Sequence, residues 1–165
     1  ILMAGFVLSL TVDGIPQILT AFSRWGEYAD DLSPAFEEIT STFTDQIEPT
    51  WFDTEGQGTW APLNPRYAAQ KERRWPGRPI LVASGALLES VTGGTGFVKI
   101  ITPTALALGT NIPYAIYHQR GTTYMPRRAV IDLSKENRTV ISKIVQRYLA
   151  KRAREAKLIA KIEDS

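Results

Sequence analysis

The sequence predicts an α+β fold, in which a small antiparallel β-sheet packs against long N- and C-terminal helices. Apolar and polar residues alternate over residues 6–12, a pattern typical of a half-buried strand, and residues 97–110 read as a hairpin with one strand through Ile100 and Ile101 and with Leu106 and Leu108 alternating on the return. Apolar residues recur every three or four positions over residues 16–51 and 134–152, a pattern typical of amphipathic helices. Clusters of Gly and Pro separate these segments and indicate loops.

The N-terminal third is expected to hold the first strand and a long helix. Gly14 closes the strand, and Pro16 suits the first turn of a helix. The apolar stripe then runs in phase through Pro34 as far as Trp51, so we expect either one helix kinked at Pro34 or two nearly collinear helices. The outer face of this helix carries the acidic residues Glu27, Asp30, Asp31, Glu37, Glu38, Asp45 and Glu48.

Short elements are expected in the middle of the chain. Asn64 and Pro65 read as the N-cap and first position of a helix that ends before Pro76. Ser84 is expected to cap a second short helix, and the glycines of residues 92–96 indicate a turn. Residues 97–110 then predict a hairpin that turns at Pro103.

The C-terminal part begins with a short helix over residues 113–121, which Gly121 ends. Residues 128–133 predict a last strand, and Ser134 is expected to cap a long helix whose apolar stripe is Val140, Ile141, Ile144, Val145, Tyr148 and Leu149. After Arg152 the apolar face is lost, so residues 153–165 are expected to form a projecting or frayed basic helical tail. We expect one domain over residues 1–165.

Composition excludes several kinds of chemistry. The chain has no cysteine and one histidine, His118, which excludes disulfides, thiolate catalysis, cysteine-based zinc sites and multi-histidine metal sites. We therefore expect no cofactor. No apolar stretch approaches the length of a membrane span, so no membrane partner is expected.

The charge is distributed unevenly along the chain. Residues 1–56 hold ten acidic residues and one basic residue, a net charge of −9, whereas residues 57–134 hold nine basic and three acidic residues. The basic part suits nucleic-acid binding. The acidic part equally suits pairing with the basic face of a neighbouring copy in a head-to-tail ring. Solvated faces without a partner are the third alternative.

His118 is the first candidate for catalysis, because it lies among aromatic residues and is followed by arginines. A general base needs a nucleophile and an orienting acid, and the chain has neither a G-x-S-x-G motif nor a cysteine. We therefore expect no catalytic residue and predict that His118 and Gln119 hold their corner of the fold together by hydrogen bonds. A hydrolase built on His118 is the alternative.

Basic clusters provide an alternative of another class, a nucleic-acid-binding module. It would use Arg73, Arg74 and Arg78 together with the basic C-terminal helix, and Trp75 lies beside the first cluster. Basic residues in the last turns of a helix also complement the helix dipole, so the clusters alone do not establish this function.

Several short motifs follow one another between residues 57 and 134. They are Trp60-Ala61-Pro62-Leu63 with Tyr67 and Lys71, Ile80-Leu81 with Ser84-Gly85-x-Leu87, Leu108-Gly109, Tyr114-Ala115-x-x-His118-Gln119-x-Gly121, and Pro126-x-Arg128. In this order the motifs resemble the phage virion morphogenesis or tail completion family. Family members often continue with a Pro-Phe-Leu-Gly-like run, where this chain has Ala129-Val130-Ile131-Asp132.

The resemblance implies a non-enzymatic virion protein in the tail or head–tail neck, assembled in the host cytoplasm. It implies a homo-oligomeric ring, commonly a hexamer, that joins a connector or head-completion protein to a tail terminator or tail tube protein. Passive contact with DNA in the channel is also implied, and a tail terminator or head–tail joining protein is the close alternative. The expected structural or interface residues are Trp60, Pro62, Leu63, Gly85, Leu87, Tyr114, His118, Gln119, Gly121, Pro126, Arg127 and Arg128.

Overall fold

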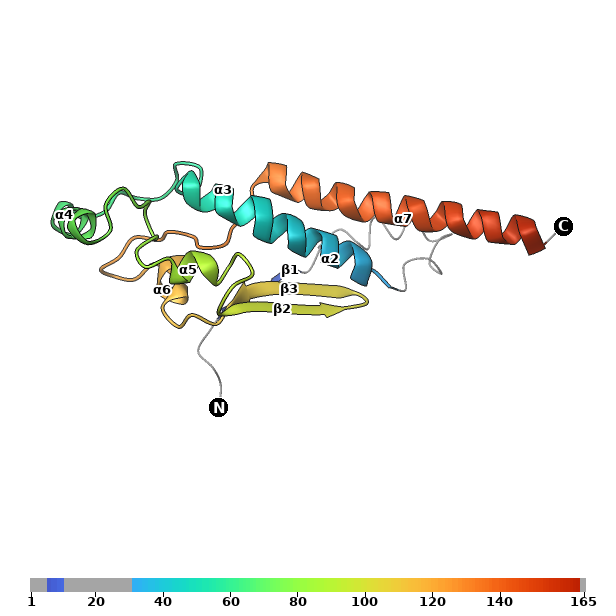
Figure 1. Ribbon diagram of the computed structural model, residues 1–165, viewed down its shortest axis with the longest axis horizontal. Coiled ribbons are helices and arrows are strands. Elements are labelled where there is room, and N and C mark those ends of the chain that lie inside the picture. Colours follow the sequence, from blue (N-terminus) through green and yellow to red (C-terminus); the bar gives the residue numbers. More distant parts are fainter. Residues whose placement is uncertain (1–5, 11–30, 164–165) are drawn as a thin grey trace. The chain divides into compact units, whose positions relative to one another are not determined.

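The computed structural model describes residues 6–10 and 31–163, with side chains for residues 31–155 (Figure 1). The chain divides into two compact units, which are described separately. The first comprises, among the described residues, 6–9, 40–99 and 107–132. The second comprises residue 10 and residues 31–39, 100–106 and 133–163.

The sheet has three strands in the order β1-β3-β2. They are β1 (Phe6–Leu10), β2 (Phe97–Thr102) and β3 (Ala105–Thr110). β2 and β3 form the predicted hairpin, and the Thr102 hydroxyl accepts a hydrogen bond from the Ala105 backbone N–H across the turn at 3.0 Å. Together with the helices below, this confirms the predicted α+β class.

A continuous helical segment runs from Ser33 to Asp53, as α2 (Ser33–Thr42), the π-helical turn η2 (Phe43–Ile47) and α3 (Glu48–Asp53). Pro34 lies in the first turn of α2, where a missing N–H costs no helical hydrogen bond. Residues 31 and 32 are not helical, so the alternative of one helix kinked at Pro34 is wrong. The expected helix over residues 16–30 lies outside the described residues.

The π-helical turn explains a second difference from the sequence prediction. Pro49 has no N–H to donate, and just before it the Glu48 N–H donates to the Phe43 carbonyl, five residues back. A π turn holds one more residue than an α turn, and Glu48 lies directly after it. Glu48 was expected on the outer acidic face, but it is fully buried.

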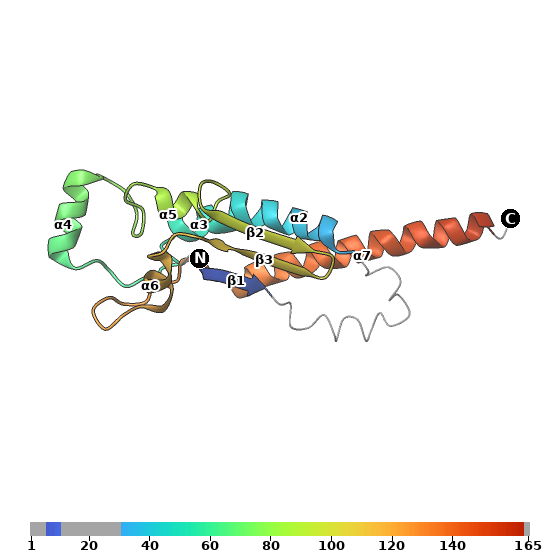
Figure 2. The ribbon, with the colours of Figure 1, turned by 90° about the horizontal axis from the view of Figure 1, so that it is seen from below.

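The second unit contains α7 (Lys135–Glu163), which lies beside the beginning of α2 (Figures 1 and 2). Ser134 caps α7 as predicted, because its hydroxyl accepts the Asn137 N–H at 3.2 Å. The Tyr148 hydroxyl donates to the Asp31 carbonyl at 2.8 Å, and Arg147 pairs with Glu38. The buried apolar side chains of this unit include Leu32, which precedes α2, and those of the two helices, Ala35, Phe36, Ile39, Ile141, Ile144, Val145, Leu149 and Ala153.

One prediction for α7 needs correction. Val140 was assigned to the apolar stripe, but it is 42% exposed. The helix runs past Arg152 through Glu163, and Ala153 is buried. No helix in the described part of the chain is long and apolar enough to cross a membrane.

The core of the first unit is built around two tryptophans. Trp51 of α3 and Trp60 of the following loop are each 6% exposed, and Phe52 packs edge-on against Trp60 with ring centroids 5.4 Å apart. The same unit contains the short helices α4 (Pro65–Arg74), α5 (Ala86–Glu89) and α6 (Ala115–Arg120). Asn64 caps α4 as predicted, because its side-chain oxygen accepts the Arg66 N–H at 3.0 Å.

Residues 128–133 do not form the predicted strand. The side-chain amide of Gln119 takes the place of a strand partner. Its Oε1 accepts the Val130 and Ile131 N–H groups at 2.7 and 3.1 Å, and its Nε2 donates to the Ile131 carbonyl at 2.9 Å. The extended segment is therefore satisfied without a neighbouring strand.

Candidate protein-interaction site

The first unit contains a pocket of about 480 Å³. Its walls come from five segments that are separated in sequence: residues 63–71 before and within α4, residues 81–87 before and within α5, Tyr114 and His118 at the cap and within α6, the turn at residues 124–126, and Arg128. Seven of the predicted site residues line it, namely Leu63, Gly85, Leu87, Tyr114, His118, Pro126 and Arg128. Tyr67, Lys71 and Ser84 of the same motifs line it as well.

Two buried cations give the pocket its charge. Lys71 and Arg128 are each 5% exposed. The Lys71 ammonium donates to the Arg78 carbonyl, and the Arg128 guanidinium donates to the Ala61 and Pro62 carbonyls at 2.7 and 2.9 Å. Burial lowers the pKa of both side chains. No carboxylate lines the pocket, so it presents positive charge between apolar walls.

His118 lies in this pocket and faces Tyr114 edge-on, with ring centroids 6.2 Å apart. Its backbone carbonyl accepts the Arg128 N–H at 2.9 Å. Its ring Nδ1 is buried and has no hydrogen-bond partner among the described residues, so His118 contributes to the corner through its backbone carbonyl. Burial lowers the pKa of His118, and the nearby Arg128 charge lowers it further, so the ring is neutral at physiological pH.

Gln119, Gly121 and Arg127 form the corner beside the pocket. Gln119 holds the extended segment, as predicted for this residue. Gly121 ends α6 with a φ of 75°. Arg127 donates from Nε to the Gln119 carbonyl at 3.1 Å and lies 3.7 Å from the Asp132 carboxylate, with its side chain 59% exposed.

Trp60 and Pro62 have internal contacts. The Trp60 indole N–H donates to the Ala129 carbonyl at 3.0 Å, so this side chain is part of the core and is not a surface anchor. The Pro62 carbonyl accepts from Arg128. Arg128 thus ties the Trp-Ala-Pro motif to the Pro-x-Arg motif, 66 residues later in the chain.

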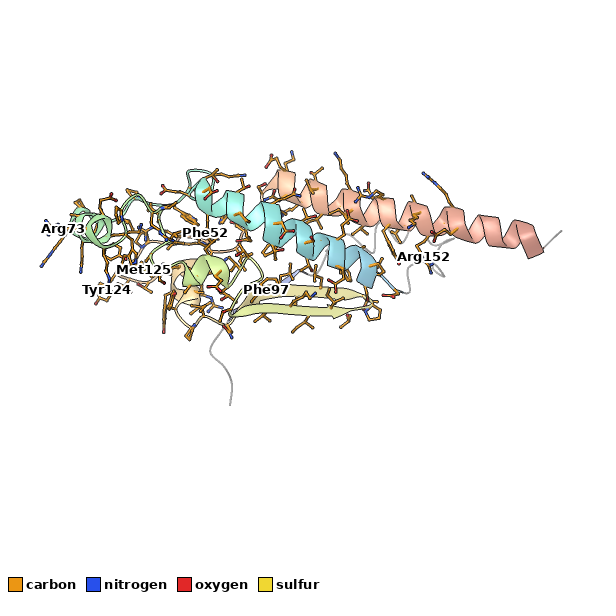
Figure 3. The ribbon with its side chains drawn as sticks, in the orientation of Figure 1. Phe52, Arg73, Phe97, Tyr124, Met125 and Arg152 are labelled. Carbon is orange, nitrogen blue, oxygen red and sulfur yellow. The ribbon has the colours of Figure 1, made fainter. Side chains whose placement is uncertain are left out.

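Three tyrosines form an exposed rim around the pocket. Tyr67, Tyr114 and Tyr124 are 47%, 44% and 97% exposed, respectively. Tyr124 lies in a tight turn closed by the Thr122 N–H, which donates to the Met125 carbonyl at 2.8 Å. Figure 3 shows the Tyr124 and Met125 side chains on this turn. Exposed tyrosine around an apolar pocket is typical of a protein-binding surface.

Sequence reasoning did not assign Lys71, Tyr124 and Met125 to the site. Lys71 belongs to a run of charged residues that resembles a solvated helix face, and its burial depends on contacts with distant residues. Tyr124 and Met125 stand in a polar loop without periodicity. An aromatic residue in such a loop is a weak signal for an interface.

The basic residues of the nucleic-acid alternative lie outside the lining of this pocket. Arg73, Arg74 and Arg78 are exposed, and the Arg74 guanidinium lies over the Trp75 ring at 4.7 Å from its centroid. Arg73 and Arg74 are in the last turn of α4, where cations complement the helix dipole. No group of three or more metal-ligating side chains occurs in the described ranges 6–10 and 31–163.

The exposed tyrosines around the pocket, and the buried residues that brace it, are features typical of a surface that binds another protein. A model of the phage virion morphogenesis family matches residues 13–150, and the chain therefore belongs to that family. This confirms the resemblance of the ordered motifs and indicates a structural role in phage virion assembly. No curated protein and no solved structure is significantly similar to the chain.

Proposed function

We propose that the protein is a tail completion or neck protein, which forms a ring that joins the tail to the head during virion assembly. Its place is the neck of the virion, and it assembles in the host cytoplasm. The partners are further copies of itself in a ring, for which a hexamer is the expected size, a connector or head-completion protein, and a tail terminator or tail tube protein. Passive contact with DNA in the channel accompanies this position.

One observation carries the proposal beyond family membership. The family-like motifs come together around one pocket that has an exposed tyrosine rim. They are far apart in sequence: Arg128 donates a hydrogen bond to the carbonyl of Pro62, which is 66 residues earlier in the chain. Buried residues of these motifs hold the pocket in shape, and exposed ones face solvent. A preformed surface of this kind suits assembly without a chemical step.

The charge distribution supports a ring. A ring of identical copies needs two different surfaces that meet head to tail. The first 56 residues carry ten acidic residues and one basic residue, whereas residues 57–134 carry nine basic and three acidic ones. Surfaces of opposite charge favour encounter in one orientation and disfavour contact between like surfaces.

Inactivating the gene in a phage that carries it tests the proposal. We expect filled heads and separate tails of normal length to accumulate in electron micrographs, and purified protein to restore joining in the lysate. Tails of uncontrolled length would instead identify a tail terminator, because a terminator stops the growth of the tube. Normal infectious particles without the gene would overturn the proposed function.

The nucleic-acid-binding alternative is supported by the exposed arginines and by the contact between Arg74 and Trp75. It predicts duplex DNA binding whose affinity falls steeply with salt, and weaker binding when Arg73 and Arg74 are replaced by Glu. A gel-shift titration at several salt concentrations measures this. A neck protein that touches DNA only passively shows no binding at physiological salt.

A further inference from the structure

We propose that the pocket of the first unit binds a carboxylate-bearing, partly apolar segment from the acidic first third of a second copy of this chain. The inference rests on the proposed ring and names the surfaces that form it. The pocket itself, from Leu63 to Arg128, is preformed within one copy.

The positive charge of the pocket favours a ligand that carries an anionic group. Lys71 and Arg128 are each 5% exposed, and both donate to neutral backbone carbonyls. The carboxylates of Glu72 and Glu55 favour the charged form of Lys71 from outside the pocket lining. Removing a cation from water is costly unless an opposite charge lies close to it. No lining residue supplies a carboxylate, so a carboxylate from outside would complete the site through charge-assisted hydrogen bonds.

The apolar walls and the aromatic rim of the pocket favour a ligand in which apolar protein residues surround that carboxylate. Leu63, Leu81, Leu87 and Met125 supply apolar surface, and the exposed tyrosines supply aromatic edges. A volume of about 480 Å³ accepts a few side chains. Tyr124, at 97% exposed, has almost all of its surface available for a partner.

A second copy of the chain offers the matching chemistry. Its first 56 residues carry a net charge of −9 and interleave acidic residues with apolar ones. Asp45 and Asp53 are exposed acidic residues in the described part of this region. The opposite charge of the two regions favours this occupant over a basic or neutral segment.

Because the chain lacks cysteine, a Tyr124→Cys variant places a single photo-crosslinker on the pocket rim. A mixture of ¹⁵N-labelled and unlabelled copies distinguishes crosslinks between copies from those within one copy by mass. We expect crosslinks from the rim to residues 1–56 of another copy. An Ala69→Cys variant is the control, because Ala69 is exposed on α4 and does not line the pocket. Crosslinks confined to one copy, or directed to residues 57–165 of another, would overturn the inference.

A charge change on the rim provides a second, independent measurement. Tyr124→Asp adds a carboxylate where the occupant brings one, and the exposure of Tyr124 leaves folding unaffected. We expect Tyr124→Asp to weaken self-association at least about tenfold in analytical ultracentrifugation, and the matched Tyr124→Phe to change it less than about twofold. Circular dichroism checks that both variants are folded.

The outcomes separate this inference from the proposed function. If Tyr124→Asp leaves the oligomer unchanged, the pocket is not the interface, while the ring stands. If the wild-type chain is monomeric at every concentration, the second copy is not the occupant, and the gene-inactivation experiment still decides whether the protein joins heads to tails.

Discussion

Trp51 and Trp60 pack edge to face, with ring centroids 6.4 Å apart and an interplanar angle of 86°, and both donate to the same Ala129 carbonyl oxygen. The two N–H groups lie 2.9 and 3.0 Å from that oxygen. A carbonyl oxygen has two lone pairs, so both bonds are compatible. This arrangement fixes residue 129 against α3 and the loop that follows it.

The shared acceptor predicts non-additive energetics. Either Trp51→Phe or Trp60→Phe leaves the Ala129 carbonyl with one partner, whereas the double variant leaves it buried with neither indole donor. We expect the double variant to lose about 1 kcal/mol more stability than the sum of the single variants. Chemical denaturation of the four proteins measures this coupling energy, and strict additivity would show that the shared carbonyl does not link the two side chains.

Removing the part-buried side chain of Gln119 is expected to reduce the stability of the protein strongly. Gln119→Ala removes one donor and one acceptor that serve Val130 and Ile131 through three hydrogen bonds. We expect a loss of about 2–3 kcal/mol in the free energy of unfolding, because the freed backbone groups remain within the fold. Gln146→Ala, at an exposed position of α7, is the control and should change stability little. Equal effects of the two substitutions would contradict the assigned role.

Gly121 and Gly58 both have a φ of 75°, and the ψ of 173° at Gly121 places it in a backbone region that is essentially restricted to glycine. A Cβ at Gly121 would lie 2.8 Å from the Arg127 backbone N, whereas a Cβ at Gly58 would meet nothing within 4 Å. We expect Gly58→Ala to cost about 1 kcal/mol for the left-handed backbone alone. Gly121→Ala should cost clearly more in thermal denaturation, since the backbone of the Arg127 turn must move as well. Similar losses for both would show that the close approach to Arg127 is unimportant.

Glu48 predicts a stabilising substitution. Its two carboxyl oxygens are buried without a hydrogen-bond partner among the residues that the structure describes. Glu48→Met keeps a similar volume and removes the buried polar group, so we expect a gain of about 1–3 kcal/mol in the free energy of unfolding. Asp53→Asn, at an exposed carboxylate of the same helix, is the control and should have little effect.

The gain from Glu48→Met depends on pH. Burial raises the pKa of the Glu48 carboxyl well above its ordinary value of 4.5, and the nearby Asp132 charge raises it further. As pH rises above 4.5, the unfolded chain releases this proton while the folded chain retains it, so the wild type loses stability up to the folded pKa. The advantage of Glu48→Met should therefore be larger at neutral pH than near pH 4.5. A gain that does not change with pH would show that Glu48 titrates alike in both states.

Local features of the fold could be predicted because their causes are local. Asn64 and Ser134 cap their helices with their own side chains, and Gly121 ends α6 through its backbone conformation. The hairpin of β2 and β3 follows from alternation on either side of a short turn.

Two predictions were wrong because the structure departs from regular secondary structure at those places. Residues 128–133 have the composition of a strand, yet the Gln119 amide satisfies their backbone groups. Glu48 follows the acidic face of its helix in a regular α-helical projection, but the π-helical turn before Pro49 changes that projection. Neither effect leaves a periodic signal in the sequence.

The sequence by itself determined the α+β class, the N-caps of α4 and α7, the charge asymmetry and the ordered motifs of the phage virion morphogenesis family, since each is carried by neighbouring residues or by their order. Only the tertiary structure decided that Trp60 and Arg128 face the interior and that Tyr124 is exposed. It also decided that Lys71 and Arg128 line one pocket. The physical reason is that burial and shared acceptors depend on which distant segments meet, and residue spacing does not specify that.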